Sequence, residues 1–223
     1  MVKLTPPMGW NSWNTFGANI NEALIKETAD AMVESGLLEK GYEYLVIDDC
    51  WSLKTRDENE RLVPDPEKFP NGMKAVADYV HSRGLKFGMY SCAGNLTCAG
   101  YPGSFEHEFI DAETFAEWGV DFLKYDYCYH SPIIHGQYLY RRMGLALENC
   151  GRDILFSACS WGSDQTHEWI KTSAASMWRS TGDIFDTWES VKDLTKQQEK
   201  LHPYNGVGCF NDMDMLIVGM YGE

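Results

Sequence analysis

The stretch GVDFLKYDYC, residues 119–128, decides the fold class. Its apolar residues predict a buried strand, and this strand ends in Lys124 and Asp126. Residues two apart in an extended chain point to the same face, so these two charged side chains are expected side by side. Burying charge is costly, and we interpret the pair as part of a functional site.

Helical and strand patterns alternate along the chain. Helical spacing of apolar residues covers 24–41, 73–84, 112–119, 138–151, 167–174 and 192–202. Short apolar strands are predicted at 8–13, 42–51, 85–92, 120–128, 153–161, 176–183 and 205–216. Each helix leads into a strand, which is the repeating unit of a parallel sheet.

The seven predicted strands favour one architecture. No glycine-rich phosphate loop follows the first strand, which argues against a Rossmann domain. Functional-looking residues cluster at the carboxyl ends of nearly all strands, as they do in barrels of alternating strands and helices. We therefore predict an α/β fold of the (β/α)8 TIM-barrel type, with about seven of its eight strands in this chain.

Composition and charge narrow the class of protein. The 223 residues, 44% of them hydrophobic, can bury one sizeable core. The formal charge of −14 repels nucleic acid and anionic membranes. No apolar run approaches the roughly 20 residues of a membrane span, and the start MVKLTPPMG lacks the apolar region of a secretory signal. We expect a cytoplasmic protein whose partners include neither nucleic acid nor membrane.

The seven cysteines point to no metal site. They are Cys50, Cys92, Cys98, Cys128, Cys150, Cys159 and Cys209. An odd number leaves at least one thiol unpaired in a monomer, and the absence of any C-x-x-C pair argues against a zinc ribbon or a thioredoxin-type site. Buried free thiols are the simplest interpretation.

Side chains that suit a binding site lie at or just after the end of each predicted strand. They are Trp13, Asp48, Asp49, Tyr90, Lys124, Asp126, Ser160, Trp161, Arg179, Asp183, Asp212 and Asp214. A single aspartate after a strand is commonly a helix cap or a turn residue. In a barrel, however, this whole set shares one rim, where carboxylates held close together destabilise the fold. The set therefore predicts a functional site.

Two chemistries use such a ring of charges. Glycoside hydrolysis needs two carboxyl groups, which lie about 5 Å apart in retaining enzymes. A magnesium site of the enolase type also takes carboxylates from successive strands, with a lysine as the base. None of the six histidines sits at the end of a predicted strand, which argues against a metal-dependent hydrolase with histidine ligands.

Several motifs resemble those of glycoside hydrolase family 27, which comprises α-galactosidases and α-N-acetylgalactosaminidases. They are MGWNSW, YEYLVIDDCW, PDPEKFPNGMKAVADYVHSRGLKFGMYS, CAGYPGSF, KYDYC, WRSTGDI and NDMDML, in the family's order and spacing. The resemblance runs from Leu4 to the last residue. It implies a retaining exo-glycosidase that needs no metal and no cofactor, with Asp126 as the nucleophile and Asp183 as the acid/base.

The resemblance also assigns residues that bind the substrate, a small oligosaccharide or glycoconjugate. Asp48 and Asp49 match the paired acids that hold the C4 and C6 hydroxyls of the sugar. Lys124 favours the ionised nucleophile and binds sugar hydroxyls. The other matching pocket positions are Trp13, Tyr90, Cys98, Arg179, Asp214 and Met215. Cys98 and Cys128 match a family disulfide that shapes the pocket wall, while Ala18 stands where a partner for Cys50 is expected.

One departure from the family pattern bears on specificity. Many α-galactosidases have Cys-Glu-Trp after the fifth strand, and the glutamate binds the 2-hydroxyl of the sugar. This chain has Ser160 there and Ser163 three positions on. Small residues at these positions resemble the α-N-acetylgalactosaminidases, which accommodate a 2-acetamido group. Both substrates, α-galactosides and α-N-acetylgalactosaminides, therefore stay open.

The length is the other departure. Family barrels continue beyond NDMDML through an eighth strand, and a small antiparallel β-domain usually follows. We therefore expect residues 1–223 to form a single catalytic barrel domain that is incomplete at the C-terminus and lacks that β-domain. A non-catalytic remnant that binds sugar is the alternative from another functional class. The presence of both Asp126 and Asp183 argues against that alternative.

Overall fold

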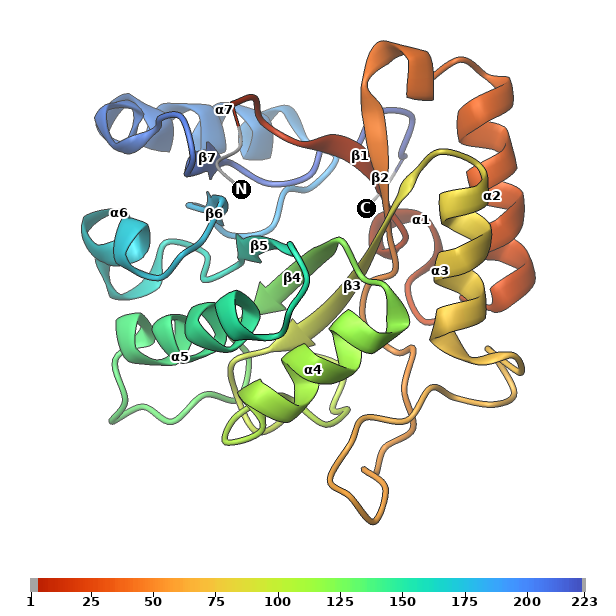
Figure 1. Cartoon of the computed structure of the whole chain (residues 1–223). Helices are drawn as coiled ribbons and strands as arrows, with labels where there is room; N and C mark the ends of the chain where they lie inside the picture. Colours follow the sequence, from red (N-terminus) through yellow and green to blue (C-terminus); the bar gives the residue numbers. More distant parts are fainter. Residues whose placement is uncertain (1–3, 222–223) are drawn as a thin grey trace.

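A computed structural model describes residues 4–221 of the chain. Seven strands form one sheet in the order of the sequence, and every neighbouring pair is parallel (Figure 1). The strands are β1 Met8–Asn11, β2 Tyr42–Val46, β3 Lys86–Cys92, β4 Phe122–Asp126, β5 Leu155–Ala158, β6 Met177–Arg179 and β7 Phe210–Asp212. This sequential parallel order confirms the predicted (β/α) barrel architecture with seven strands.

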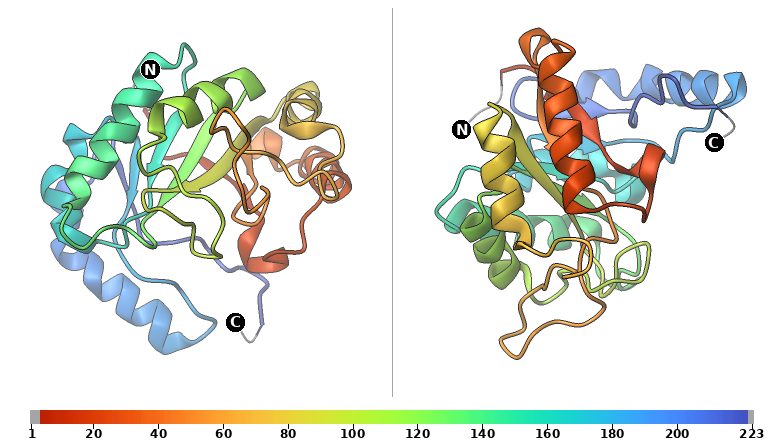
Figure 2. Two further views of the ribbon diagram at one scale, coloured as in Figure 1. Left: turned by 90° about the horizontal axis from the view of Figure 1, so that it is seen from below. Right: turned by 90° about the vertical axis from the view of Figure 1, so that its right-hand side faces the viewer.

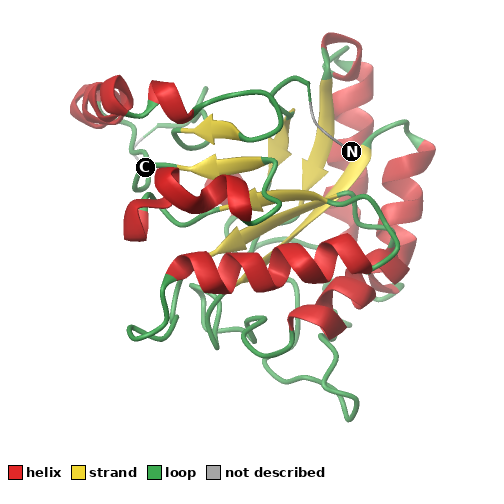
Figure 3. Cartoon of the chain, turned by 60° about the vertical axis from the view of Figure 1, so that its left-hand side comes forward, coloured by secondary structure: helices red, strands yellow, loops and turns green. Residues whose placement is uncertain are grey.

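Helices follow the strands and lie outside the sheet (Figures 2 and 3). The α-helices are α1 Trp13–Phe16, α2 Glu22–Glu34, α3 Gly72–Ser82, α4 Glu108–Trp118, α5 Gly136–Asn149, α6 Thr166–Trp169 and α7 Trp188–Gln197. The 3-10 helices are η1 Leu38–Lys40, η2 Ser163–Gln165, η3 Ile170–Thr172, η4 Gln198–Lys200 and η5 His202–Tyr204. Among residues 4–221, no helix combines the length and the apolar character that crossing a membrane requires.

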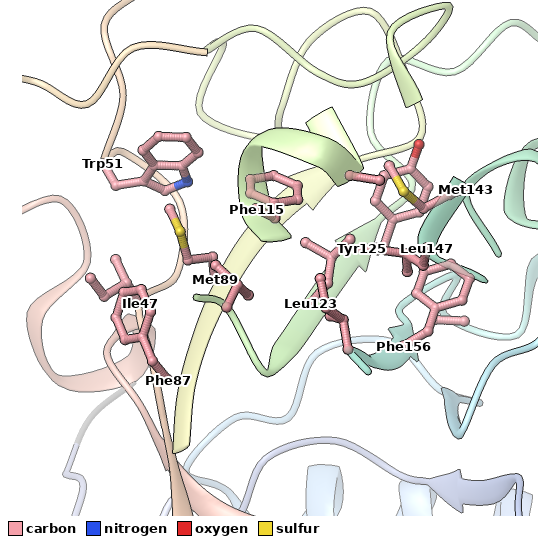
Figure 4. Close-up of a cluster of buried hydrophobic side chains, with 14 of the residues drawn as sticks. Ile47, Trp51, Phe87, Met89, Phe115, Leu123, Tyr125, Met143, Leu147 and Phe156 are labelled. Carbon is pink, nitrogen blue, oxygen red and sulfur yellow. The ribbon is translucent and has the colours of Figure 1, made fainter. Parts of the chain in front are cut away.

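The two faces of each strand serve different purposes. Leu123 and Tyr125 of β4 point outward and pack with Phe115 of α4 and other apolar side chains beneath the helices (Figure 4). Phe122 faces inward, where it joins a small apolar cluster at the amino ends of the strands. Lys124 and Asp126 follow at the same two-residue spacing, so they point inward above that cluster. Because of this alternation, both charged side chains lie on the inner face at the carboxyl end of β4.

Several element ends differ from the prediction for local reasons. The strand predicted at 8–13 ends at Asn11, because Asn11 Oδ1 accepts a hydrogen bond from the Trp13 backbone N–H at the start of α1. The helix predicted at 192–202 begins earlier, since Thr187 caps α7 by accepting from the Ser190 backbone N–H. The helix predicted at 167–174 divides into the short α6 and η3.

Candidate active site

A cavity of about 510 Å³ opens at the carboxyl ends of the strands. Its wall combines five carboxylates, two cations and several aromatic rings. The residues predicted for the site that line it are Trp13, Asp48, Asp49, Tyr90, Cys98, Lys124, Cys128, Asp126, Trp161, Arg179, Asp183, Asp214 and Met215. The structure thus brings together residues that are spread over most of the sequence.

Asp126 is the last residue of β4, and its side chain is almost completely buried in the cavity wall. Its Oδ2 accepts a hydrogen bond from the Tyr90 hydroxyl at 3.1 Å, and its Oδ1 accepts from the Tyr127 backbone N–H at 2.9 Å. Burial raises the pKa of Asp126 above its ordinary value, and Lys124 and the two hydrogen bonds oppose that rise. The carboxylate is therefore fixed in direction and weakly solvated.

Lys124 pairs with Asp48 inside the barrel. Its Nζ donates to Asp48 Oδ2 at 2.7 Å, and Asn11 Nδ2 donates to the same oxygen at 2.8 Å. Burial on its own lowers the pKa of Lys124, but the carboxylates of Asp48 and Asp126 more than reverse this effect, so its pKa lies above the ordinary value. Lys124 is consequently a fixed cation between two carboxylates.

Asp49 is oriented by the backbone. Its Oδ1 accepts from the Cys50 N–H at 2.7 Å, and its Oδ2 accepts from the Ala99 N–H at 2.9 Å. Burial raises the pKa of Asp49, while these backbone hydrogen bonds lower it. Asp48 Oδ1 and both oxygens of Asp49 accept one backbone hydrogen bond each and keep a lone pair available, so Asp48 and Asp49 can accept hydrogen bonds from two neighbouring hydroxyls of a bound molecule.

Arg179 organises the other side of the cavity. Its Nη2 lies 2.6 Å from Asp183 Oδ1 and 3.0 Å from Asp214 Oδ2. Arg179 and Asp214 are buried, whereas the Asp183 side chain is 73% exposed. Burial raises the pKa of Asp214 above its ordinary value, although the charge of Arg179 opposes that rise. Asp183 therefore stands at the solvent side of the cavity, where a group entering or leaving can reach it.

Cys98 and Cys128 form a disulfide in the cavity wall. The Tyr90 hydroxyl, which donates to Asp126, also lies 3.3 Å from Cys98 Sγ. The ligand atoms of Cys98, Cys128 and Asp126 are close enough for a metal ion, but the bonded sulfur atoms have no thiolate to offer. Cys50, for which no partner was expected, is a buried free thiol.

Ser160, which was predicted to bind substrate, is not among the residues that line the cavity. It is fully buried, and its hydroxyl lies 2.5 Å from Thr166 Oγ1. Thr166 donates in turn to the Ser163 carbonyl at 2.6 Å, which closes the turn after β5. Trp161 lines the cavity there instead, with a left-handed backbone.

The sequence analysis did not identify some residues that contribute to the site. Asn11, which orients Asp48, belongs to the MGWNSW motif and precedes Trp13 by two residues, so the strand period could have found it. The Ala99 backbone N–H that holds Asp49 has no side-chain signature at all. Further lining residues that the sequence analysis did not single out are Asn14, Gly182, Ile184, Phe185 and Ile217.

Comparisons with known proteins agree with this geometry. Residues 5–223 match the family described as Alpha galactosidase A. The alpha-galactosidase of Cyamopsis tetragonoloba is 52% identical over 219 residues, which are 98% of this chain and 53% of that protein. Alpha-galactosidase A of Cellvibrio japonicus is 49% identical over 226 residues, covering 96% of this chain and 55% of that protein.

A solved structure gives the same result. The alpha-galactosidase of Saccharomyces cerevisiae, whose structure was determined with raffinose, superposes with a TM-score of 0.95 at 39% identity. The match covers 99% of this chain and 54% of the yeast chain. The chain thus spans about half the length of the relatives it matches. The match over residues 5–223 and these identities show that the chain belongs to the Alpha galactosidase A family, glycoside hydrolase family 27.

Proposed function

We propose that the protein is a glycoside hydrolase that releases terminal α-linked galactose from oligosaccharides or glycoconjugates. One observation carries this proposal: Asp126, oriented and nearly buried, and Asp183, largely exposed, line the same cavity. Two carboxyl groups with such different surroundings suit the two roles of glycoside hydrolysis. The choice of galactose as the sugar is based on the relatives that are named alpha-galactosidases.

In the first step Asp126 Oδ attacks the anomeric carbon of the galactoside. The glycosidic C–O bond breaks as Asp183 gives its proton to the departing oxygen, which leaves a galactosyl ester on Asp126. Asp126 must be ionised for this attack. Lys124, the Tyr90 hydroxyl and the Tyr127 N–H all stabilise its anion.

In the second step Asp183, now ionised, takes a proton from a water molecule. The water oxygen attacks the anomeric carbon from the side that the leaving group vacated, and the ester bond to Asp126 breaks. Galactose leaves with the configuration it had in the substrate. The exposure of Asp183 gives water a path to this position.

Recognition of the sugar is assigned to the fixed polar groups. Asp48, Asp49 and Lys124 present oriented acceptors and a donor to sugar hydroxyls on one side of the cavity. Trp13 offers an aromatic face for the apolar face of the ring. Raffinose, the sugar in the yeast structure, is our first candidate substrate.

An α-N-acetylgalactosaminide is the less favoured substrate. That alternative rested on small residues, Ser160 and Ser163, facing the 2-position of the sugar. Neither residue lines the cavity, so the structure adds no observation in its favour. A non-catalytic sugar-binding role also lacks support of its own, since both carboxylates lie in the cavity.

The test is paired hydrolysis of nitrophenyl α-galactoside and nitrophenyl α-N-acetylgalactosaminide. We expect the galactoside to be preferred and Asp126→Asn to lose turnover by at least about 1,000-fold, because the nucleophile is gone. Glu58→Gln, at an exposed position away from the cavity, is the control for a lost carboxylate. Preference for the acetamido sugar would overturn the assigned substrate. Galactose binding without hydrolysis would favour the non-catalytic role.

A further inference from the structure

The turn after β5 has an unusual backbone. Trp161, Asp164 and Gln165 all have left-handed conformations, with φ of 57°, 53° and 54°. This region is unfavourable for residues with a Cβ and persists only where surrounding contacts hold it. Trp161 forms part of the cavity wall. The contacts that hold this turn therefore decide where that wall lies.

Asp164 supplies such contacts from two sides. Its Oδ2 accepts from the Tyr127 hydroxyl at 2.6 Å and from the Gly136 N–H at 2.8 Å, while its carbonyl accepts from Trp169 Nε1 at 2.7 Å. Partial burial raises the pKa of Asp164, but the hydrogen bonds from Tyr127 and Gly136 bring it below its ordinary value. Asp164 thus joins the turn after β5, the residue after the β4 strand and the first residue of α5.

Tyr127 connects this contact to the nucleophile. It follows Asp126 directly, and its backbone N–H donates to Asp126 Oδ1 at 2.9 Å. Its ring is buried, with its centroid 6.3 Å from that of Trp161 in an edge-to-face arrangement. On its other side the ring stacks on His130 at 3.8 Å. A shift of Tyr127 would therefore move both the nucleophile and the wall.

We propose that Asp164 is a positioning residue for the proposed hydrolysis. Through its contact with Tyr127, Asp164 fixes the positions of Asp126 and Trp161. This inference rests on the proposed function and goes beyond it, since Asp164 does not line the cavity. A displacement of about 1 Å in a reacting group can cost about 100-fold in rate. The carboxylate of Asp164 is well placed to prevent such a displacement.

The competing explanation is that Asp164 only stabilises a surface turn. Asp57 provides the matched control, because its Oδ1 also accepts two backbone hydrogen bonds, from Asn59 and Arg61. Asp57 lies in an exposed loop that contributes no residue to the cavity wall near Asp126. Asp57→Asn therefore measures the loss of a turn carboxylate without the link to the nucleophile.

The test measures kcat and KM on nitrophenyl α-galactoside, together with the Kd for galactose by calorimetry. We expect Asp164→Ala to lower kcat/KM by about 10- to 100-fold and to weaken galactose binding. Asp164→Asn keeps one acceptor oxygen, so its kcat/KM and its galactose affinity should lie between those of Asp164→Ala and the unmodified protein. Asp57→Asn stays within about twofold of the unmodified protein in every parameter.

Tyr127→Phe keeps the test decisive if Asp164→Ala does not fold. Tyr127→Phe removes the hydrogen bond between Tyr127 and Asp164, and Asp164→Asn weakens the same bond, so their combined effect on kcat/KM should be smaller than the product of the single effects. Variants of Asp164 that lower the melting temperature but leave kcat, KM and galactose Kd unchanged would overturn the inference. An unmodified protein that hydrolyses neither nitrophenyl glycoside would overturn the proposed function instead.

Discussion

Lys124 Nζ donates to Asp48 Oδ2 at 2.7 Å and so links β4, the strand that it shares with Asp126, to the segment after β2. The stretch KYDYC suggested a pair of Lys124 and Asp126 side by side. The two residues do share the inner face of β4, and Lys124 in addition bridges two carboxylates, since it donates to Asp48 and acts on Asp126 through its charge. One cation thereby offsets part of the repulsion between two buried carboxylates.

Replacing Lys124 should destabilise the fold. Lys124→Met leaves Asp48 buried without its cation, and breaking a buried pair in this way typically costs about 3–5 kcal/mol of the free energy of unfolding. Lys74→Met is the control, because Lys74 and Asp78 form an exposed pair worth at most about 0.5 kcal/mol. Urea unfolding at pH 7 measures both. Equal losses would contradict the bridging role of Lys124.

The pH dependence of activity should report Asp126. Burial raises its pKa above the ordinary value of 3.8, and only the ionised form attacks. The value of kcat/KM should therefore fall with decreasing pH at a higher pH than an ordinary aspartate would give. Tyr90→Phe removes a hydrogen bond to the anion and should raise the pKa further, moving this fall to still higher pH. The measurement is kcat/KM from pH 3 to 8 for the unmodified protein and Tyr90→Phe. A fall in kcat/KM that moves to lower pH in Tyr90→Phe would contradict the assignment of Asp126.

Arg179 should not be replaceable by lysine. Its Nη2 lies within reach of both Asp183 and Asp214, and a lysine cannot reproduce the planar geometry of the guanidinium. We expect Arg179→Lys to lower kcat/KM by at least about tenfold, because Asp183 loses its fixed position. Arg61→Lys, at the exposed pair with Glu117, should leave kcat/KM unchanged. Full activity of Arg179→Lys would show that Asp183 is positioned by other contacts.

Reduction of the disulfide should loosen the cavity wall. Cys98 and Cys128 are 30 residues apart, and closing a loop of this length stabilises a fold by about 3–4 kcal/mol in the chain-entropy account. A phosphine reductant should therefore lower the melting temperature by roughly 8–15 °C. The double variant Cys98→Ser, Cys128→Ser should melt at the reduced value and no longer respond to the reductant. A melting temperature insensitive to reductant in the unmodified protein would contradict this prediction.

The strand period explains why much of the fold could be predicted from the sequence. Phe122, Lys124 and Asp126 alternate with Leu123 and Tyr125, and this pattern alone separates the inner face of β4 from the outer one. Similar apolar patterns mark the other strands, so the order of the strands and the shared rim at their carboxyl ends could be predicted as well. The end points were less predictable, because they depend on local caps such as Asn11 and Thr187.

The turn after β5 was the least predictable part of the site. Ser160 was expected at the sugar because it stands where many family members have a glutamate, but in the turn with the left-handed Trp161 its hydroxyl contacts Thr166. No sequence pattern indicates that conformation, since it is held by contacts from Asp164 to residues 28 and 37 positions away. Such contacts exist only once the fold has formed.

The central claim, that Asp126 is the nucleophile, can be tested by trapping the galactosyl intermediate. A fluorinated α-galactosyl fluoride slows hydrolysis of the intermediate, because fluorine destabilises the cationic transition state, while the good leaving group keeps the first step fast. Peptide mass spectrometry then locates the label. We predict one fluorogalactosyl group on the peptide that contains Asp126 and none in Asp126→Asn. A label on any other residue, or turnover that leaves this peptide unlabelled, would contradict the claim.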